Sequence, residues 1–166
     1  MPLAASWRLP GTKRPFEIGS VLRQIRAAVR PLPKAAMFAL AEEGYGSLFE
    51  QLVACILSIR TRDEVSLVAA RRLFEVARAP KELAALPTIR IDRLIGEVTF
   101  HEVKAEQIRT VARRTVEQYA SELPCDAEVL RAFHGVGPKC AHLALGIACG
   151  EQRISVDTHV HRVTNR

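Results

Sequence analysis

The sequence lacks the long apolar run that a membrane-spanning protein needs. No run reaches the roughly 18 residues that cross a bilayer, and the N-terminus lacks the basic-then-apolar order of a secretory signal. No segment has the polar, low-complexity composition typical of a disordered chain. With 166 residues, 48% of them hydrophobic, the chain can bury a core. We therefore expect an intracellular, cytoplasmic protein with no membrane partner.

Cysteine pairs at metal-binding spacing are also absent. The four cysteines include no Cys-x-x-Cys pair, which excludes a zinc ribbon and a thioredoxin-like redox motif. Three of them lie within apolar helical patterns, so we expect reduced thiols that serve as small core residues. His159 and His161 do not suggest a metal site, because two positions along a helix turn side chains about 200° apart. We predict that the chain binds no metal.

Regular alternation of apolar and polar residues is missing as well. No stretch alternates for long enough to require a strand, so the fold class that we predict is all-α, a helical bundle. Ser47 and Thr88 are expected helix N-caps, and Asp126 is expected to cap a short helix. Apolar residues recur at helical spacing over about 16–29, 48–57, 63–76, 81–86, 89–97 and 103–120.

The net charge of +6 is concentrated near the N-terminus. Residues 1–34 hold seven basic residues and one acid, and seven minus one accounts for the whole +6. Residues 1–16, with three prolines and one glycine, predict a basic flexible arm. Such an arm is attracted by a nucleic-acid phosphate backbone, which binds cations without presenting a sequence. A solvated tail that only aids solubility is the alternative that charge alone leaves open.

A short stretch with two glycines predicts a tight hairpin between two helices. Gly135 and Gly137 flank one apolar residue, Val136, which is expected to pack inward while both glycines adopt conformations costly for other residues. Pro138 then suits the first position of a new helix. The free backbone N–H groups of that helix terminus can bind a phosphate oxygen. The pattern, over about residues 126–149, resembles the helix-hairpin-helix motif of DNA-repair proteins.

Two polar residues downstream extend the resemblance. Taken singly, Lys139 predicts another phosphate contact, and Asp157 predicts an N-cap. Together they match the endonuclease III family of helix-hairpin-helix glycosylases, in which a Gly-Val-Gly-x-Lys hairpin is followed, 18 residues after the lysine, by the aspartate of Val-Asp-Thr-His. Here 157 minus 139 is also 18. The resemblance covers about residues 20–166 and includes Leu57-Ser58 and the segment 104–108.

The resemblance implies base-excision repair of double-stranded DNA that carries a damaged base or an abasic site. The expected enzyme is a DNA glycosylase and abasic-site lyase, with oxidised pyrimidines as its substrates, acting as a monomer at the nucleoid. Its catalytic residues are Lys139, whose amine captures sugar C1′ and forms a Schiff base, and Asp157, whose carboxylate stabilises charge on the sugar. Gly135, Val136 and Gly137 are the expected DNA-binding hairpin.

The resemblance also implies two loops that enter the DNA where a base has been flipped out. One contains Arg60 and Arg62, with Arg60 at the place of a glutamine in many relatives. The other contains Phe100 and His101, either of which is a candidate wedge. Arg60 and Arg62 are equally consistent with phosphate contact or solvation, and Phe100 with a core position. Because arginine replaces glutamine, removal of mismatched or alkylated bases by a related glycosylase stays an alternative.

The chain departs from the family pattern in two places. His134 stands where the family usually has proline. Relatives continue past the Val-Asp-Thr-His segment, and many hold a four-iron four-sulfur cluster there on four cysteines that this sequence does not contain. We therefore expect no cofactor, and a glycosylase domain over residues 17–166 without the cluster-binding segment. The second alternative that follows is a DNA-binding protein that keeps the hairpin but has little or no turnover.

Overall fold

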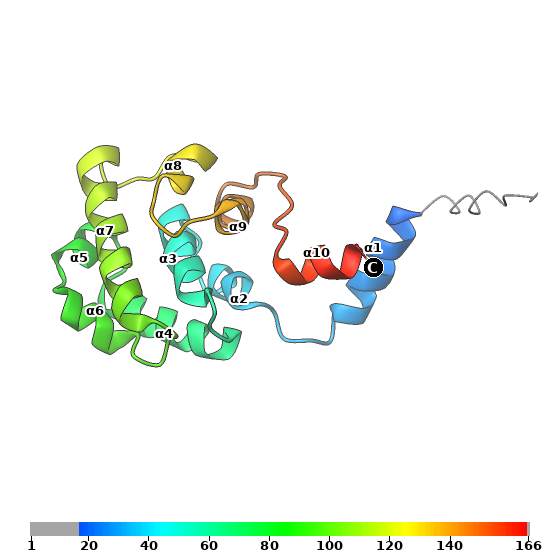
Figure 1. Cartoon of the computed structure of the whole chain (residues 1–166), viewed down its shortest axis with the longest axis horizontal. Helices are drawn as coiled ribbons and strands as arrows, with labels where there is room; N and C mark the ends of the chain where they lie inside the picture. The colour runs from blue at the N-terminus through cyan, green and yellow to red at the C-terminus, as the bar shows by residue number, and fades with distance from the viewer. Residues whose placement is uncertain (1–16, 166) are drawn as a thin grey trace, which may run out of the picture. The chain divides into compact units, whose positions relative to one another are not determined.

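The computed structural model describes residues 17–165 of the chain. This range contains ten α-helices and no strand, which confirms the predicted all-α class (Figure 1). None of these described helices combines the length and the apolar character needed to cross a membrane. The predicted basic arm over 1–16 lies outside the described residues. The chain divides into two compact units after Pro33, and each is described by itself.

The first unit is described from Glu17 onward and consists of helix α1 (Ile18–Val29). Its bounds agree with the helix expected from apolar periodicity, but none of its residues is buried, and Ile18, Leu22 and Ile25 are exposed. A domain boundary after residue 16 was predicted. The contacts place the division after residue 33 instead, so α1 belongs to the first unit.

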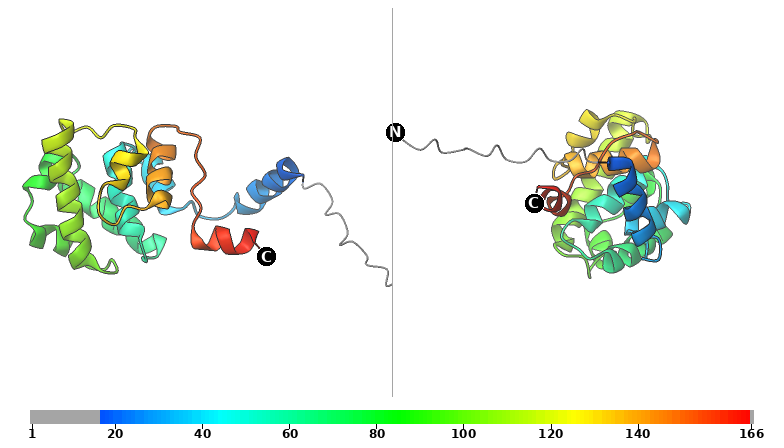
Figure 2. Two further views of the ribbon diagram at one scale, coloured as in Figure 1. Left: turned by 45° about the horizontal axis from the view of Figure 1, so that its top comes forward. Right: turned by 90° about the vertical axis from the view of Figure 1, so that its right-hand side faces the viewer.

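The second unit holds the hydrophobic core and all of the remaining helices. Its longest helix is α7, and the helices α2 to α9 all contribute residues to the core. Figures 1 and 2 show α3 in the middle of these helices, between α7 and α9. The helices of this unit are α2 (Ala36–Glu42), α3 (Leu48–Ser58), α4 (Asp63–Val76), α5 (Pro80–Ala85), α6 (Thr88–Leu94), α7 (His101–Tyr119), α8 (Ala127–Arg131), α9 (Pro138–Ala148) and α10 (Thr158–Thr164).

Helix α3 lies at the centre of this unit. Its sequence is apolar nearly all round, and every residue from Leu48 to Leu57 is buried. Ser47 begins the helix as predicted: its hydroxyl accepts from the Glu50 backbone N–H, and the Glu50 carboxylate accepts from the Ser47 N–H, which completes a capping box. Helices α2, α4, α7 and α9 all contact α3, so its position determines where their ends lie.

Two local predictions about helix starts were incomplete. Helix α2 was not predicted, because Ala35, its N-cap residue, has no side chain that can cap a helix. Its Ala36 N–H donates instead to the Asp63 carboxylate at 3.1 Å, a partner 27 residues away that periodicity does not show. Thr88 was predicted as an N-cap and is the first residue of α6, with Pro87 at the cap position. Proline there removes an N–H that would have no partner anyway.

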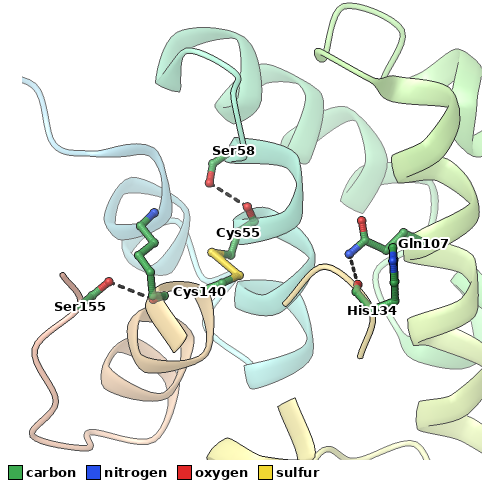
Figure 3. Close-up of a disulfide and its surroundings, with 7 residues drawn as sticks. Cys55, Ser58, Gln107, His134, Cys140 and Ser155 are labelled. Atoms are coloured by element: carbon green, nitrogen blue, oxygen red, sulfur yellow. Dashed lines mark hydrogen bonds between the residues drawn. A yellow bond between two sulfur atoms is a disulfide. The ribbon is translucent and has the colours of Figure 1, made fainter. Parts of the chain in front are cut away.

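The expectation of reduced cysteines was wrong. Cys55 on α3 is paired with Cys140 on α9, with Cα atoms 5.9 Å apart, and Cys125 is paired with Cys149 across 6.2 Å. Both separations suit disulfides. Sequence spacing could not show either pair, because each depends on how the helices pack. The Cys125–Cys149 pair closes a chain segment that contains α8 and α9. The Cys55–Cys140 pair joins α9 to the central helix α3 (Figure 3).

The pair Cys125–Cys149 should contribute measurably to stability. Replacing both cysteines with serine should lower the free energy of unfolding by about 2–4 kcal/mol in oxidising buffer, because the open loop gains conformational entropy in the unfolded chain. Cys125 is exposed, so serine costs little there on its own. Urea unfolding in oxidising and reducing buffer measures the difference. The variant and the parent should match in reducing buffer, and a match in oxidising buffer would contradict the crosslink.

Candidate functional site

The two helices α8 and α9 are joined by the predicted hairpin. Asp126 caps α8 through its carboxylate, which accepts from the Glu128 N–H at 2.8 Å. Val136 packs inward and is buried, as expected. On the other side of the turn, Gln107 of α7 donates its amide to the His134 carbonyl oxygen (Figure 3). Two contacts therefore hold the hairpin to the core: the buried Val136 side chain and the hydrogen bond from the Gln107 amide.

The two hairpin glycines differ in what they require. Gly135 has φ of +78°, and a Cβ there would meet the Gln107 amide nitrogen at 2.6 Å, so this position needs glycine. Gly137 was also expected to need a glycine conformation, and this was wrong: its φ is −90° and its ψ is 176°, which any residue adopts. Nothing within 4 Å would touch a Cβ at Gly137. The turn itself therefore does not need glycine at this position. The missing side chain leaves free space beside the beginning of α9, which is the open side of the hairpin.

Lys139 is the second residue of α9, as predicted, and its side chain is exposed. The next residue, Cys140, is buried and joined to α3, which fixes the first turn of the helix. The Ser155 hydroxyl donates to the Lys139 carbonyl oxygen at 2.9 Å. This contact ties the chain that leads into α10 to the beginning of α9 (Figure 3). The lysine is thus placed by two connections that do not involve its own amine.

Asp157 is the N-cap of α10, which was the simpler of its two predicted roles. Its carboxylate accepts from the Val160 N–H at 2.8 Å. This hydrogen bond holds the pKa of Asp157 below its usual value, and the Lys139 ammonium nearby adds to the effect. The carboxylate is therefore ionised throughout the neutral pH range. The N-cap hydrogen bond therefore keeps Asp157 in its charged form.

Lys139 and Asp157 line one cleft of about 280 Å³. Asp63 and Ser58, at the start of α4 and the end of α3, lie on the same cleft. Neither was predicted as a site residue, although Ser58 belongs to the Leu57-Ser58 segment that carries the resemblance. The half-exposed ring of Phe38 is a further lining residue that periodicity could not identify. The remaining lining residues are small or apolar, apart from Ser155: Ala35, Ala36, Met37, Leu143, Ser155 and Val160.

The two predicted DNA-entering loops lie side by side. The Arg60 guanidinium carbon is 5.9 Å from the centre of the Phe100 ring, and the Thr99 N–H donates to the Thr61 hydroxyl at 3.2 Å. Arg60 and Phe100 both have left-handed backbones, with φ of 55° and 60°, at an energetic cost on the order of 1–3 kcal/mol each. Such strain persists only where the surrounding contacts impose it.

The other two predicted loop residues are placed differently. His101 is half-buried, and its Nδ1 lies 2.6 Å from the Asp92 carboxylate, which raises the pKa of the imidazole. This ion pair directs His101 into the protein, whereas Phe100 is 57% exposed. Of the two candidate wedges, the geometry favours Phe100. Arg62 is exposed at the N-cap position of α4.

A larger hollow lies away from these residues. It measures about 580 Å³ and is lined by the starts of α3 and α5 and the end of α9. The Glu50–Arg78 ion pair forms part of its wall. None of the predicted site residues lines it. Size alone therefore does not identify the site.

The cysteines do not fit a metal cluster. A four-iron four-sulfur cluster needs four thiolates around one centre. Here the four sulfurs are used in two separate disulfides. Within residues 17–165, no group of three or more potential metal-binding side chains is found.

Comparisons with known proteins agree with this arrangement. A family model described as "HhH-GPD superfamily base excision DNA repair protein" matches residues 53–166. Endonuclease III of Thermotoga maritima is 41% identical over 118 residues, which cover 71% of this chain and 55% of that protein. The chain therefore spans little more than half the length of this curated relative.

Two solved structures are also similar. "Structure of a non-covalent Endonuclease III-DNA Complex" gives a TM-score of 0.74 at 27% identity and covers 89% of this chain and 65% of that chain. "Structure of a Trapped Endonuclease III-DNA Covalent Intermediate: Estranged-Adenine Complex" gives 0.73 at 27% identity, with 89% and 66% covered. The residues that the family model matches, 53–166, include both candidate loops, the hairpin, Lys139 and Asp157.

The two hairpin glycines allow a test of whether the DNA backbone approaches the hairpin at Gly137. Gly137→Ala should leave the melting temperature unchanged or slightly higher, because the backbone and the space both accept alanine. Its affinity for duplex DNA should fall by roughly tenfold or more if a backbone hydrogen bond to phosphate is lost. Fluorescence anisotropy with labelled duplex and thermal melting give the two values.

Two matched glycines complete the comparison. Gly46→Ala is the control, because its Cβ also meets nothing within 4 Å, and it lies before α3, at the far end of that helix from Ser58. Gly135→Ala should lower stability as well as affinity, through its positive φ. Equal DNA affinity for Gly137→Ala and the parent would show that the DNA backbone does not approach this position.

Proposed function

Because the chain belongs to the HhH-GPD superfamily of base excision DNA repair proteins, we propose that it is a DNA glycosylase with abasic-site lyase activity. Its proposed substrate is duplex DNA with a damaged base, an oxidised pyrimidine in the first instance, and it works as a monomer at the nucleoid. The observation that carries the proposal is that Lys139 and Asp157 line one cleft beside the hairpin.

The proposed binding mode uses the open side of the hairpin. The first intrahelical bond of α9 runs from the Ala141 N–H to the Gly137 carbonyl, so the N–H groups before Ala141 have no partner within the helix. Together with the positive end of the helix dipole, they suit a phosphate oxygen. A DNA strand held there passes Lys139, since that residue lies in the same first turn.

The base must leave the duplex before it can be removed. In the proposed complex, the flipped nucleotide enters the cleft, where the Phe38 ring and the Leu143 side chain offer an apolar wall. Arg60 and Phe100 fill the space that the base vacates. Arg60 only donates hydrogen bonds, so it would pair with acceptor groups of the base left behind.

The proposed chemistry then divides between two residues. As the N-glycosidic bond breaks, its electron pair leaves with the base, and positive charge develops at C1′. The Asp157 carboxylate stabilises that charge. The Lys139 ammonium gives a proton to the departing base, and the resulting free amine attacks C1′ and forms a carbon–nitrogen bond in place of the bond to the base.

Strand cleavage follows from the same covalent bond. The sugar ring opens to a Schiff base between C1′ and the Lys139 nitrogen. Loss of a C2′ proton then allows β-elimination, in which the 3′ phosphate leaves with the electron pair of its C–O bond. Water finally hydrolyses the Schiff base and releases the lysine. Each step uses only the amine, the carboxylate and water.

The products formed from defined duplexes test this proposal. The purified chain is incubated with duplexes that contain one abasic site or one thymine glycol, and the strands are resolved by length. We expect release of the damaged base and a β-elimination nick. Tight binding without products would favour the DNA-binding alternative. Excision only from a G·T mismatch or from 3-methyladenine would favour the related glycosylases.

Asp157 gives a sharper test, because its two roles predict different results. Asp157→Asn retains much of the capping ability but removes the charge. Single-turnover base excision should fall by about 100- to 1000-fold, the scale for loss of one electrostatic stabiliser. Cleavage of a pre-formed abasic site should fall much less, because no base departs in that reaction.

The matched control is Asp126→Asn, the same change at the N-cap of α8. Both variants should show similar small changes in melting temperature, and only Asp157→Asn should lose excision. The pKa of Asp157 is lowered, so its capping contribution is complete above its unfolded-state pKa and is lost only as the pH falls through the folded value. Parent-like excision by Asp157→Asn would make this residue a helix cap only.

A further inference from the structure

Among the described residues, one lysine is buried, and it lies outside the candidate cleft. Lys104 is in the first turn of α7 and is 4% exposed. Its ammonium donates to the carbonyl oxygens of Leu57 at 3.0 Å and Ile59 at 2.6 Å, and to the Thr61 hydroxyl at 3.2 Å. An ammonium group has three donors, and all three are used. Burial of this charge lowers the pKa of Lys104 to about 8.

All three partners belong to the segment that carries Arg60. Leu57 is in the last turn of α3, and Ile59 and Thr61 lie on either side of Arg60. A buried cation with only neutral partners is costly, and a shorter apolar residue would avoid that cost. The Lys104 ammonium is one donor that binds the residues on both sides of Arg60, which has the left-handed backbone.

The same cluster reaches the second loop. The Thr61 hydroxyl accepts from Lys104 and also from the Thr99 N–H. Thr99 precedes Phe100, the other left-handed residue, and the Phe100 carbonyl accepts from the Lys104 N–H at 3.0 Å, at the start of α7. Lys104 therefore contacts the first loop through its side chain and the second through its backbone. The Arg60 guanidinium faces the Phe100 ring above this cluster.

We propose that Lys104 is a positioning residue that locks the Arg60 loop and the Phe100 loop into one rigid wedge, which enters the DNA as a single piece. The inference rests on the proposed function, since it concerns how the vacated space is filled. Lys104 touches neither DNA nor the reacting atoms. Its effect is that two strained, exposed side chains reach the DNA without being ordered on binding.

The first test uses the protein without DNA. Lys104→Met keeps the apolar stem and removes the donor, so the loop should open more often. Trypsin cleavage after Arg60 should accelerate by about tenfold relative to cleavage after Arg153, an exposed reference in another loop. Thr115→Val is the matched control, because it removes a buried hydrogen bond of the same helix, from its hydroxyl to the Val111 carbonyl.

The second test measures whether the two loops still fill the vacated space when the protein binds DNA. A duplex carries a non-cleavable abasic analogue opposite 2-aminopurine, whose fluorescence reports whether its stacking is disturbed. Lys104→Met should lose most of the fluorescence change, and its preference for this duplex over undamaged duplex should fall by about tenfold. Its affinity for undamaged duplex should stay near that of the parent, since the hairpin is intact. Thr115→Val should match the parent in every one of these values.

The outcomes separate the inference from the proposed function. If Lys104→Met lowers only the melting temperature, with parent-like trypsin cleavage and fluorescence, the positioning role is wrong. If Lys104→Met does not fold, Thr61→Val removes the shared hydroxyl and should give the same changes to a smaller degree; no change would overturn the proposal. If the parent itself does not prefer abasic DNA while the trypsin result holds, the loops are locked but the proposed function fails.

Discussion

The packing of α9 against α3 is the contact on which the rest of the site depends. Cys140 of α9 reaches Cys55 of α3, and two other buried residues of α9, Ala141 and Ala144, are small. The contact places the beginning of α9, with the hairpin and Lys139, beside the end of α3, where the Arg60 loop begins. Buried apolar area supplies the stabilisation, and the Cys55–Cys140 pair joins the same two helices. One helix pair therefore positions the hairpin, Lys139 and the Arg60 loop.

At this site, charged groups are held by hydrogen bonds to uncharged groups, mostly of the backbone, more than by ion pairs with other side chains. The start of α9 presents N–H groups where a phosphate would lie, and the start of α10 holds the Asp157 carboxylate ionised. Lys104 uses carbonyl and hydroxyl oxygens in the same way to hold a loop. Backbone dipoles are fixed by the fold and do not need to reorganise when DNA binds. Such preorganisation is what electrostatic stabilisation of a transition state requires.

Local patterns predicted the parts of this structure that local interactions determine. Helical periodicity located α3, α4 and α7, and side-chain capping rules identified Ser47 and Asp126. The spacing of Lys139 and Asp157 indicated the family resemblance, and both residues line one cleft, which the spacing alone did not show. Long-range contacts were not predictable in this way: α2 begins with a cap supplied by Asp63, and the disulfides depend on helix packing. Gly137 was misjudged because the motif does not distinguish a glycine needed for the turn from one that leaves space.

The central claim is that Lys139 is the nucleophile, and covalent trapping tests it most directly. The chain is mixed with duplex DNA that contains an abasic site, borohydride reduces any Schiff base, and the adduct is digested and sequenced by mass spectrometry. The account predicts one protein–DNA adduct, attached to the peptide that contains Lys139, and none with Lys139→Gln at equal DNA occupancy. An adduct at the N-terminal amine or at another lysine, or equal trapping by Lys139→Gln, would contradict it.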